Sequence, residues 1–358
     1  MQQQKNCAGL LGICWLVLAG LVGAAEIEID PKATIENSPT TLLGVSHIGL
    51  SVKDLGAVLP FYQEATRFEL LRRGTLSGPA ADALFARPGV EADVAVLRAP
   101  NMLFELVEFR HNADAATSKR PFEGPGMTHT CFQTTAADSG YERFRKVGSD
   151  MLTRGEAPID LAGRGVTYAY GYDPEGNMFE MEQLDPALIE RDPLRTRWLE
   201  EGHSAWMTQV AMATHDLERL VDWYQKVLAF SPSRQGDFVE HPGMIQVADH
   251  DGLSLRVAWF QLAQRTKTLE LWQMRVPETQ EYGKKRGLTD LGYSYSLEVG
   301  DIQAEYRRMK ELGVEFVSEP IELSDRWQVY AHDIDGNVFA LRQWVDPESP
   351  HSVAKLDH

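Results

Sequence analysis

Ser46-His47-Ile48-Gly49-Leu50-Ser51-Val52-Lys53-Asp54-Leu55 is the stretch that decides the fold of this chain. Its apolar residues alternate with small or polar ones as far as Val52, which is the pattern of a strand with one covered face. Asp54 is a good residue to cap a helix, so we expect a helix from there to about Thr66. Pro60 lies within this helix and predicts a bend, because proline removes one backbone hydrogen bond.

The same pattern is repeated later in the chain. It recurs 162 residues further on as Thr208-Gln209-Val210-Ala211-Met212-Ala213-Thr214-His215-Asp216-Leu217. A second motif, Asp173-Pro174-Glu175-Gly176-Asn177-Met178-Phe179-Glu180, recurs 160 residues further on as Asp333-Ile334-Asp335-Gly336-Asn337-Val338-Phe339-Ala340. Each copy of this motif predicts a tight turn that leads into a last strand. The chain is therefore a duplication, and we expect an α+β fold of four βαβββ units.

We expect these units to form two tandem domains, at residues 42–184 and 205–346. Residues 185–204 carry Pro186, Pro193 and mixed charges without strand alternation, so we interpret them as the linker between the domains. Residues 347–358, which include Pro347 and Pro350, are interpreted as a loose tail.

The first 25 residues have the layout of a secretory signal peptide. Lys5 precedes an apolar run from Ala8 to Val22, and small residues follow before Glu26. The run of about 15 residues is short against the ~20 that span a bilayer. We expect cleavage between about Ala24 and Glu26, export to the periplasm or the medium, and no membrane attachment afterwards.

The net charge argues against one class of partner, and the cysteine content argues against disulfide bonds. The formal net charge is −17, so the surface repels phosphate backbones, and nucleic acid is not an expected partner. Of three cysteines, Cys7 and Cys14 lie in the predicted signal. Only Cys131 then remains, and no intramolecular disulfide is expected. We interpret Cys131 as a small buried core thiol.

A βαβββ unit that opens with His-Ile-x-Leu-x-Val-x-Asp-Leu, paired with one that closes in Asp-Pro-x-Gly-Asn-x-x-Glu, resembles the vicinal-oxygen-chelate superfamily. That family includes glyoxalase I, methylmalonyl-CoA epimerase, extradiol dioxygenases, and the bleomycin and fosfomycin resistance proteins. The resemblance covers roughly residues 42 to 345. It implies that paired units curl their sheets into a cupped groove, with a metal held by the first and last strands. The motifs are specific for the fold and poor at naming the reaction.

The resemblance places metal ligands at His47, Glu105, His129 and Glu180. The strand pattern supports this, because a carboxylate inside an apolar strand is costly unless a cation compensates its desolvation. We therefore expect one divalent ion, Fe²⁺, Zn²⁺, Ni²⁺ or Mn²⁺, in the N-terminal domain. The matching positions of the second half are Gln209, Glu270, Ser294 and Ala340. Two neutral small residues do not complete a tight site, so we interpret the C-terminal domain as a degenerate copy.

The preferred chemistry is redox-neutral. Two imidazoles and two carboxylates balance a divalent ion, and a substrate with neighbouring oxygens would bind through both. The ion then stabilises an enediolate, and a carboxylate moves the proton. By resemblance, Glu180 is the expected ligand that also acts as base, with Glu105 as the second catalytic carboxylate. The chain is thus expected to be a glyoxalase-like or epimerase-like lyase or isomerase that acts on a small molecule, as a monomer or a homodimer.

Two alternatives remain open. His47, His129 and Glu180 alone form a triad of two histidines and one carboxylate suited to Fe(II), so an extradiol ring-cleaving dioxygenase is the first. Against it, residues 163–169 lack the histidine that this signature wants, and in such two-domain enzymes the C-terminal domain keeps the metal. The second alternative is a non-catalytic protein that sequesters a small molecule, as the resistance proteins do. A complete four-ligand site argues against it.

Overall fold

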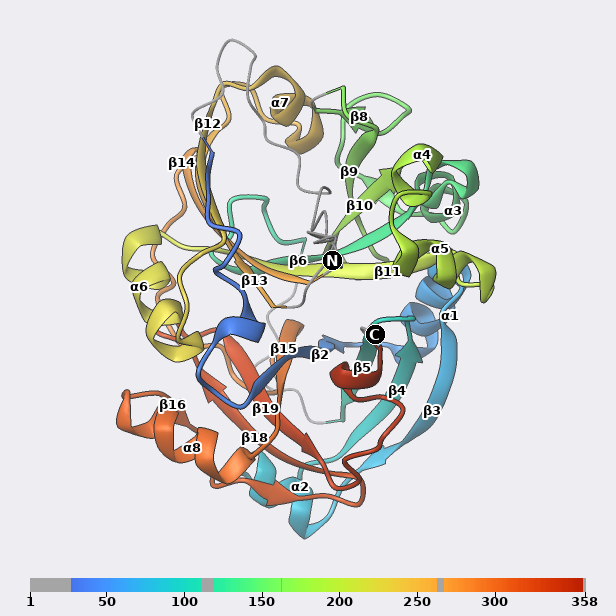
Figure 1. Cartoon of the computed structure of the whole chain (residues 1–358). Helices are drawn as coiled ribbons and strands as arrows, with labels where there is room; N and C mark the ends of the chain where they lie inside the picture. Colours follow the sequence, from blue (N-terminus) through green and yellow to red (C-terminus); the bar gives the residue numbers. More distant parts are fainter. Residues whose placement is uncertain (1–26, 111–118, 162, 263–266, 357–358) are drawn as a thin grey trace, which may run out of the picture.

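The computed structural model describes residues 27–110, 119–161, 163–262 and 267–356. Two large mixed sheets lie one above the other, with helices between them on both sides (Figure 1). Sheet A has the strand order β1-β12-β13-β14-β11-β6-β10-β9-β7, with β8 paired to β9. Sheet B has the order β16-β18-β19-β15-β2-β5-β4-β3, with β17 paired to β18.

The elements follow the four predicted units. Unit 1 comprises β2 (Leu42–Val52), α1 (Leu55–Thr66), β3 (Glu69–Leu76), α2 (Pro79–Leu84), β4 (Ala92–Arg98) and β5 (Leu103–Phe109). Unit 2 comprises β6 (Gly126–Thr135), α3 (Gly140–Lys146), β7 (Asp150–Met151), β8 (Ile159–Asp160), β9 (Val166–Tyr172) and β10 (Met178–Leu184). Unit 3 comprises β11 (Ala205–Ala213), α6 (Leu217–Leu228), β12 (Arg234–Val239), α7 (Pro242–Ala248), β13 (Ser254–Gln261) and β14 (Thr268–Val276). Unit 4 comprises β15 (Gly292–Val299), α8 (Ile302–Glu311), β16 (Glu315–Phe316), β17 (Ile321–Glu322), β18 (Arg326–His332) and β19 (Val338–Trp344).

The α+β fold and its four units are confirmed, and so is the helix start at Asp54. The Asp54 carboxylate accepts a hydrogen bond from the Ala57 backbone N–H at 3.1 Å. Its repeat, Asp216, caps α6 in the same way by accepting from the Arg219 N–H at 3.0 Å. These side chains satisfy N–H groups that have no partner in the first turn of a helix.

The pairing of the units differs from the tandem arrangement expected from their order along the chain. In sheet A, β6 of unit 2 pairs antiparallel with β11 of unit 3. In sheet B, β2 of unit 1 pairs antiparallel with β15 of unit 4. Each sheet therefore joins one unit from residues 42–184 to one from residues 205–346. Units 2 and 3 are consecutive in the chain, and consecutive elements tend to be neighbours in space.

One apolar core lies between the backs of the two sheets and includes their helices. On β2, Ile48, Leu50 and Val52 are buried in this core, as the alternation predicts. On β10, Phe179 and Met181 are buried in the same way. The opposite, concave face of each sheet forms a cup, called cup A in sheet A and cup B in sheet B.

The Asp-x-x-Gly-Asn turns tie the two sheets together. Tyr62 of α1 donates a hydrogen bond to Asp173, at the turn between β9 and β10, at 3.1 Å. In the repeat, Tyr224 of α6 donates to Asp333, at the turn between β18 and β19, at 2.9 Å. Because each helix belongs to one sheet and each turn to the other, these buried bonds fix the sheets relative to each other.

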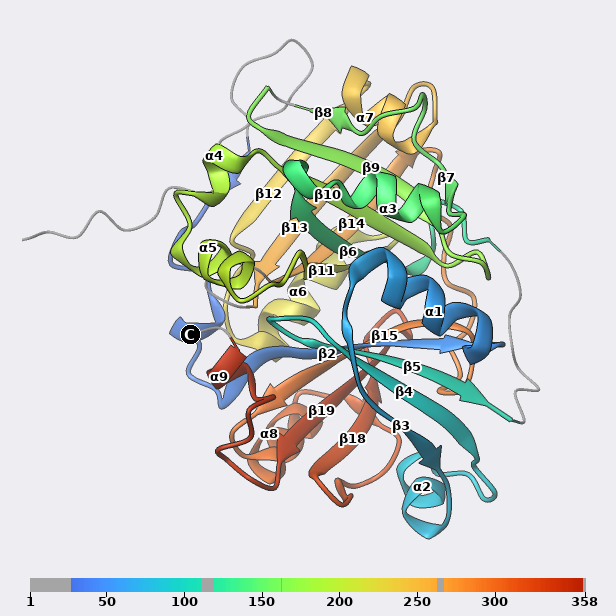
Figure 2. The ribbon, with the colours of Figure 1, turned by 90° about the vertical axis from the view of Figure 1, so that its right-hand side faces the viewer.

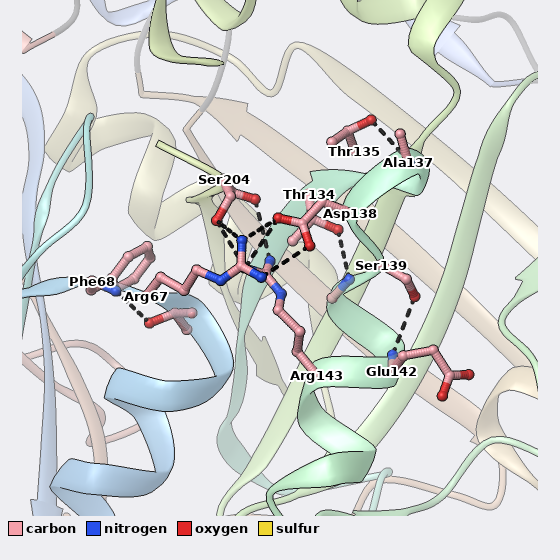
Figure 3. Close-up of polar contacts among 12 residues, drawn as sticks. Arg67, Phe68, Thr134, Thr135, Ala137, Asp138, Ser139, Glu142, Arg143 and Ser204 are labelled. Carbon is pink, nitrogen blue, oxygen red and sulfur yellow. Dashed lines mark hydrogen bonds and ion pairs between the residues drawn. The ribbon is translucent and has the colours of Figure 1, made fainter. Parts of the chain in front are cut away.

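A polar contact at the end of α1 has the same effect (Figure 3). Arg67 caps α1 and its Nη2 donates to Asp138 at 3.2 Å. Asp138 precedes α3, and Arg143 of α3 donates to Ser204 at 2.8 Å, just before β11. The cluster therefore joins unit 1 to the units of sheet A, where α1 and α3 lie side by side (Figure 2).

The predicted linker and tail are both packed parts of the fold. Residues 185–204 contain α4 (Pro186–Ile189) and α5 (Pro193–Glu200), and Trp198 of α5 is buried against Trp206. In the tail, α9 (Val353–Leu356) follows Ser352, and the Val353 N–H donates to Glu298 at 3.0 Å. Residues 347–356 pack onto the fold and satisfy this buried carboxylate, which corrects the expectation of a loose segment for the described part of the tail.

The remaining elements are short. They are β1 (Glu28–Ile29), which pairs with β12, and two short 3-10 helices at Ile35–Asn37 and Ala136–Asp138. The predicted signal peptide, residues 1–25, lies outside the described residues. Among the residues that the structure describes, no helix has the length and apolar character needed to cross a membrane.

Candidate metal centre

Four side chains meet on the floor of cup A, and they come from both halves of the chain. His129 lies on β6, Glu180 on β10, Gln209 on β11 and Glu270 on β14. The register brings them together, because Ala211 lies opposite His129 on one side and Glu270 on the other. Since side chains alternate between faces, all four point away from the core.

The four groups are within reach of a single ion. His129 Nε2 lies 3.5 Å from Glu180 Oε2 and 3.8 Å from Glu270 Oε2. Ligand atoms of these three residues all lie within 4.8 Å of one another. The Gln209 amide N–H donates to Glu270 Oε2 at 2.9 Å and also to Glu180. A half-turn of this amide would present its oxygen instead.

Surrounding groups hold these side chains in place. His129 Nδ1 lies 3.0 Å from the Thr128 hydroxyl, so that Nε2 faces the cluster. The Trp259 indole N–H donates to Glu270 Oε1 at 2.6 Å. Tyr170 packs edge-on against the His129 ring at 5.0 Å between centroids. Such outer contacts orient the ligands of a metal site.

Burial sets the charge state of the cluster. It lowers the pKa of His129 to about 4, so the imidazole is neutral and able to bind a cation at pH 7. Burial raises the pKa of Glu180 to about 7. Burial, followed by the charge of Glu180, raises the pKa of Glu270 to about 7. Two buried carboxylates so close together are costly to ionise unless a cation lies between them.

The cluster passes a chemical test for a divalent ion. Two carboxylates balance a 2+ charge, and an imidazole and an amide add neutral ligands. His129 Nε2 is buried and has no hydrogen-bond partner among the described residues. A buried nitrogen in this state is the atom that a bound cation would satisfy.

A second group of possible ligands, Cys131, Glu180 and Glu182, lies beside the first. Burial, followed by the charge of Glu182, raises the pKa of the Cys131 thiol well above its usual value. A thiol ligand binds as thiolate, so this group fits a cation less well than the group with His129. Cys131 is fully buried and free, as the sequence predicted.

The cluster opens into a cavity of about 230 Å³. Glu180, Gln209 and Glu270 are at its polar end. Apolar side chains, among them Leu161, Phe238, Met244 and Trp259, line the cavity together with charged ones that include Glu182, Arg195 and Arg234. A pocket with apolar walls and a few convergent polar groups is the usual form of a small-molecule site.

The structure corrects the predicted ligand set. His129 and Glu180 lie together in cup A, whereas His47 and Glu105 lie in sheet B. Glu105 accepts a hydrogen bond from Arg342 at 3.0 Å. His47 is buried beside Trp344, with 5.8 Å between ring centroids. The four residues do not share a site, because units 1 and 2 belong to different sheets.

The structure also brings two residues of the second half into the same cluster. Gln209 and Glu270, interpreted as remnants of a degenerate copy, complete the cluster around His129 and Glu180. The signal was present in the sequence, since both residues stand at ligand positions of the repeat. What was missing was the knowledge that unit 2 pairs with unit 3. Glu182, a half-buried carboxylate two residues beyond Glu180 that lines the same cavity, was not singled out.

Comparison with known families agrees with this architecture. Residues 45–228, more than half of the chain, match the glyoxalase-like domain family. Residues 206–341 match the glyoxalase/bleomycin resistance protein/dioxygenase superfamily. The chain therefore belongs to this superfamily, the vicinal-oxygen-chelate proteins, and its two sheets correspond to the two-domain form of the fold.

Individual relatives are distant. A lactoylglutathione lyase of Oryza sativa subsp. japonica is 23% identical over 234 residues, which are 64% of this chain and 70% of the relative. The structure of glyoxalase I from Zea mays is 20% identical with a TM-score of 0.54, over 86% of this chain and 94% of that one. A putative dioxygenase from Bacillus subtilis is 9% identical with a TM-score of 0.54, over 86% and 87%. At these identities the structural matches establish the fold.

Proposed function

We propose that the chain is a divalent-metal-dependent lyase or isomerase of the redox-neutral, glyoxalase-like or epimerase-like kind, with its site in cup A. The observation that carries this proposal is the cluster of His129, Glu180, Gln209 and Glu270 at the polar end of a cavity. The lactoylglutathione lyase among its relatives supports the same class. The substrate is a small molecule with two neighbouring oxygens and an apolar part.

The residues of cup A have different roles in the proposed reaction. His129, Glu180 and Glu270 would hold the ion, and Gln209 would add its amide oxygen. When bound, the ion supplies a Lewis acid that stabilises negative charge developing on a substrate oxygen. Glu180 takes a proton from the carbon next to that oxygen and returns it to the product. Burial raises the pKa of Glu180 by disfavouring its ionised form, which helps this carboxylate to accept the proton. The apolar walls exclude water from the proton in transit.

The oxidative alternative loses the observation that supported it. It required His47, His129 and Glu180 on one ion, and His47 lies in sheet B. The cluster in cup A has one histidine and two carboxylates, which differs from the triad of two histidines and one carboxylate used for O₂ chemistry. The resemblance to a putative dioxygenase concerns the fold alone.

Metal content and turnover test the proposal together. His129→Ala and Glu270→Ala should each abolish binding of one divalent ion per chain, because each removes a ligand. The matched changes His47→Ala and Glu105→Ala, at the equivalent level of sheet B, should leave the ion bound. Turnover of a panel of 2-oxoaldehydes should survive strict exclusion of O₂ and replacement of the metal by Zn²⁺.

Three results would contradict the proposal. Metal retained in both His129→Ala and Glu270→Ala would place the ion elsewhere. Sustained O₂ uptake with any catechol would establish the oxidative alternative. Tight binding of a small molecule without turnover of any substrate would favour the sequestering role.

A further inference from the structure

Cup B contains a second cavity, of about 360 Å³. Its floor carries Glu105, Ser294, Arg326 and Gln328, and Arg72 lies at its edge. Cup B is the counterpart of cup A, but nothing in the proposed reaction uses it. The question is which ligand its chemistry suits.

The strand registers of the two sheets match position by position. In sheet A, Ala211 lies opposite His129 and Glu270, and Cys131 lies opposite Glu180. In sheet B, Gly49 lies opposite Ser294 and Glu105, and Ser296 lies opposite Ala340. Ser294 therefore stands where cup A has His129, and Ala340 where cup A has Glu180. The two lost ligands leave no cation site at this level of sheet B.

A guanidinium takes the place of the cation. Arg342, two residues beyond Ala340, donates from Nη2 to Glu105 Oε1 at 3.0 Å, and both side chains are buried. Glu182 occupies the equivalent place in cup A. Burial disfavours ionisation of Glu105, but Arg342 and Arg326 outweigh it and lower the pKa of Glu105 to about 2. Glu105 is therefore a carboxylate whose charge is already balanced.

The arginines of cup B exceed its carboxylates. Arg326 donates to Asp325 at 2.7 Å and to Gln328 at 2.8 Å, and Arg72 donates to the same Asp325 at 2.9 Å. Asp325 thus serves two arginines, while Arg342 is paired with Glu105. The other charged lining residues, Arg73 and Glu322, cancel. Arg72 also lies 4.0 Å from Glu105. Together these groups leave one positive charge in excess for a ligand.

The far end of the cavity is apolar. It is lined by Leu76, Leu84, Phe85, Phe109 and Leu323. Leu84, Phe85 and Phe109 belong to a buried cluster beneath α2 that is separate from the main core. This end has the dimensions of a small ring or a short chain rather than of a second charged group.

We propose that cup B is a metal-free binding site for a small monocarboxylate with an apolar tail. The carboxylate binds to Arg326 and Arg72, with Gln328 and Ser294 as neutral partners, and the tail enters the apolar end beneath α2. Arginine suits this role because its planar group matches a carboxylate. The two cups of one fold thus carry opposite electrostatic requirements, a cation in cup A and an anion in cup B.

Three molecules with the same skeleton test the charge requirement by calorimetry on the full-length, metal-loaded protein. 3-Phenylpropanoate should bind with one site per chain. 3-Phenylpropan-1-ol and 3-phenylpropylamine should bind at least tenfold more weakly, since they lack the negative charge. Equal binding of the acid and the alcohol would overturn the proposal.

Single-residue variants test where on the protein the acid binds. Arg72→Gln and Arg326→Gln should each weaken binding of the acid about tenfold or more. Arg72 is partly exposed, so its change tests the proposal even if Arg326→Gln does not fold. Arg110→Gln, which removes an exposed arginine outside the cavity, should leave the affinity unchanged. Glu180→Gln should also leave it unchanged, whereas loss of binding in that variant would place the acid on the ion in cup A and refute the site.

Discussion

Glu105 and Glu270 stand at equivalent positions of the two sheets, yet their surroundings give them opposite behaviour. Glu270 shares its pocket with Glu180, and burial together with that charge raises its pKa to about 7. Glu105 faces Arg342 and Arg326, which overcome the effect of burial and lower its pKa to about 2. The residue type is the same, but Glu105 is hydrogen-bonded to an arginine, whereas Glu270 lies beside a second carboxylate. Arg234, which lines the same cavity, interacts with the charge of Glu270, and a metal ion in cup A would balance the carboxylates further.

The charge of the cluster predicts how stability depends on pH. In the metal-free protein, the pKa values of Glu180 and Glu270 are about 7, above the ordinary value of 4.5. Between these values the folded state holds protons that the unfolded state releases, so the free energy of unfolding falls as pH rises. Metal binding needs the ionised carboxylates and strengthens over the same range. The gap in Tm between metal-loaded and metal-free protein should therefore widen from pH 5 to pH 8.

Thermal unfolding with and without a chelator measures this gap. The double variant Glu180→Gln and Glu270→Gln is the control, since its metal-free form should lose the part of the pH dependence that these two carboxylates contribute. A gap that stays constant from pH 5 to pH 8 would show that these carboxylates do not bind the ion.

At the level of elements, the helices show how far local sequence governs local structure. Asp54, Asp216 and Asp301 each precede a helix, and each caps it by accepting a hydrogen bond from an N–H three residues on. Pro60 lies inside α1, which continues to Thr66. Local signals of this kind act through neighbouring residues, so they operate whatever the tertiary arrangement.

Loss of the contact between α1 and the turn after β9 should lower the free energy of unfolding by a measurable amount. Tyr62→Phe removes the donor to Asp173, a buried carboxylate, without changing the packing of the ring. We expect the free energy of unfolding to fall by about 1–3 kcal/mol, the usual cost of a lost hydrogen bond to a buried charged group. Urea unfolding monitors the change. Tyr224→Phe, in the repeated contact with Asp333, should have a similar effect.

Tyr306→Phe provides the matched control. Its hydroxyl accepts from Lys310 at 3.2 Å, in a half-buried contact within α8 that involves no buried charge, and the change should cost under about 0.5 kcal/mol. If Tyr62→Phe were as mild as this control, the turn would not be fixing the sheets to each other.

At the scale of the whole molecule, the pairing of units predicts that the halves hold together without a covalent link. Gly202 is exposed in the turn before β11 and is a suitable place to insert a protease site. After cleavage the pairs β6–β11 and β2–β15 still join the halves through two sheets. We expect both fragments to co-elute in native size exclusion with the metal retained. Fragments that separate without denaturant would contradict the pairing.

We also propose that the protein is exported, on the basis of Lys5, the apolar run from Ala8 to Val22 and the small residues before Glu26. N-terminal sequencing of the protein from the periplasm or medium should begin between about Ala24 and Glu26. Finding Met1 on that material would refute the cleavage.

The sequence by itself determined the four units, the helix caps and the faces of the strands. Each of these features depends on contacts over a few residues, or on alternation within one strand, so the local sequence determines it. The ligand residue types were equally visible, since His129, Glu180, Gln209 and Glu270 all stand at repeat positions that the motifs mark.

Only the tertiary structure decided which of these positions share a site. The four units share one pattern of strands and helices, so any two of them could pair through their first strands. The sequence therefore does not say which first strands pair. In the structure the first strands of units 2 and 3 pair in sheet A, and those of units 1 and 4 pair in sheet B. This pairing places Gln209 and Glu270 beside Glu180, and it places Arg342 beside Glu105.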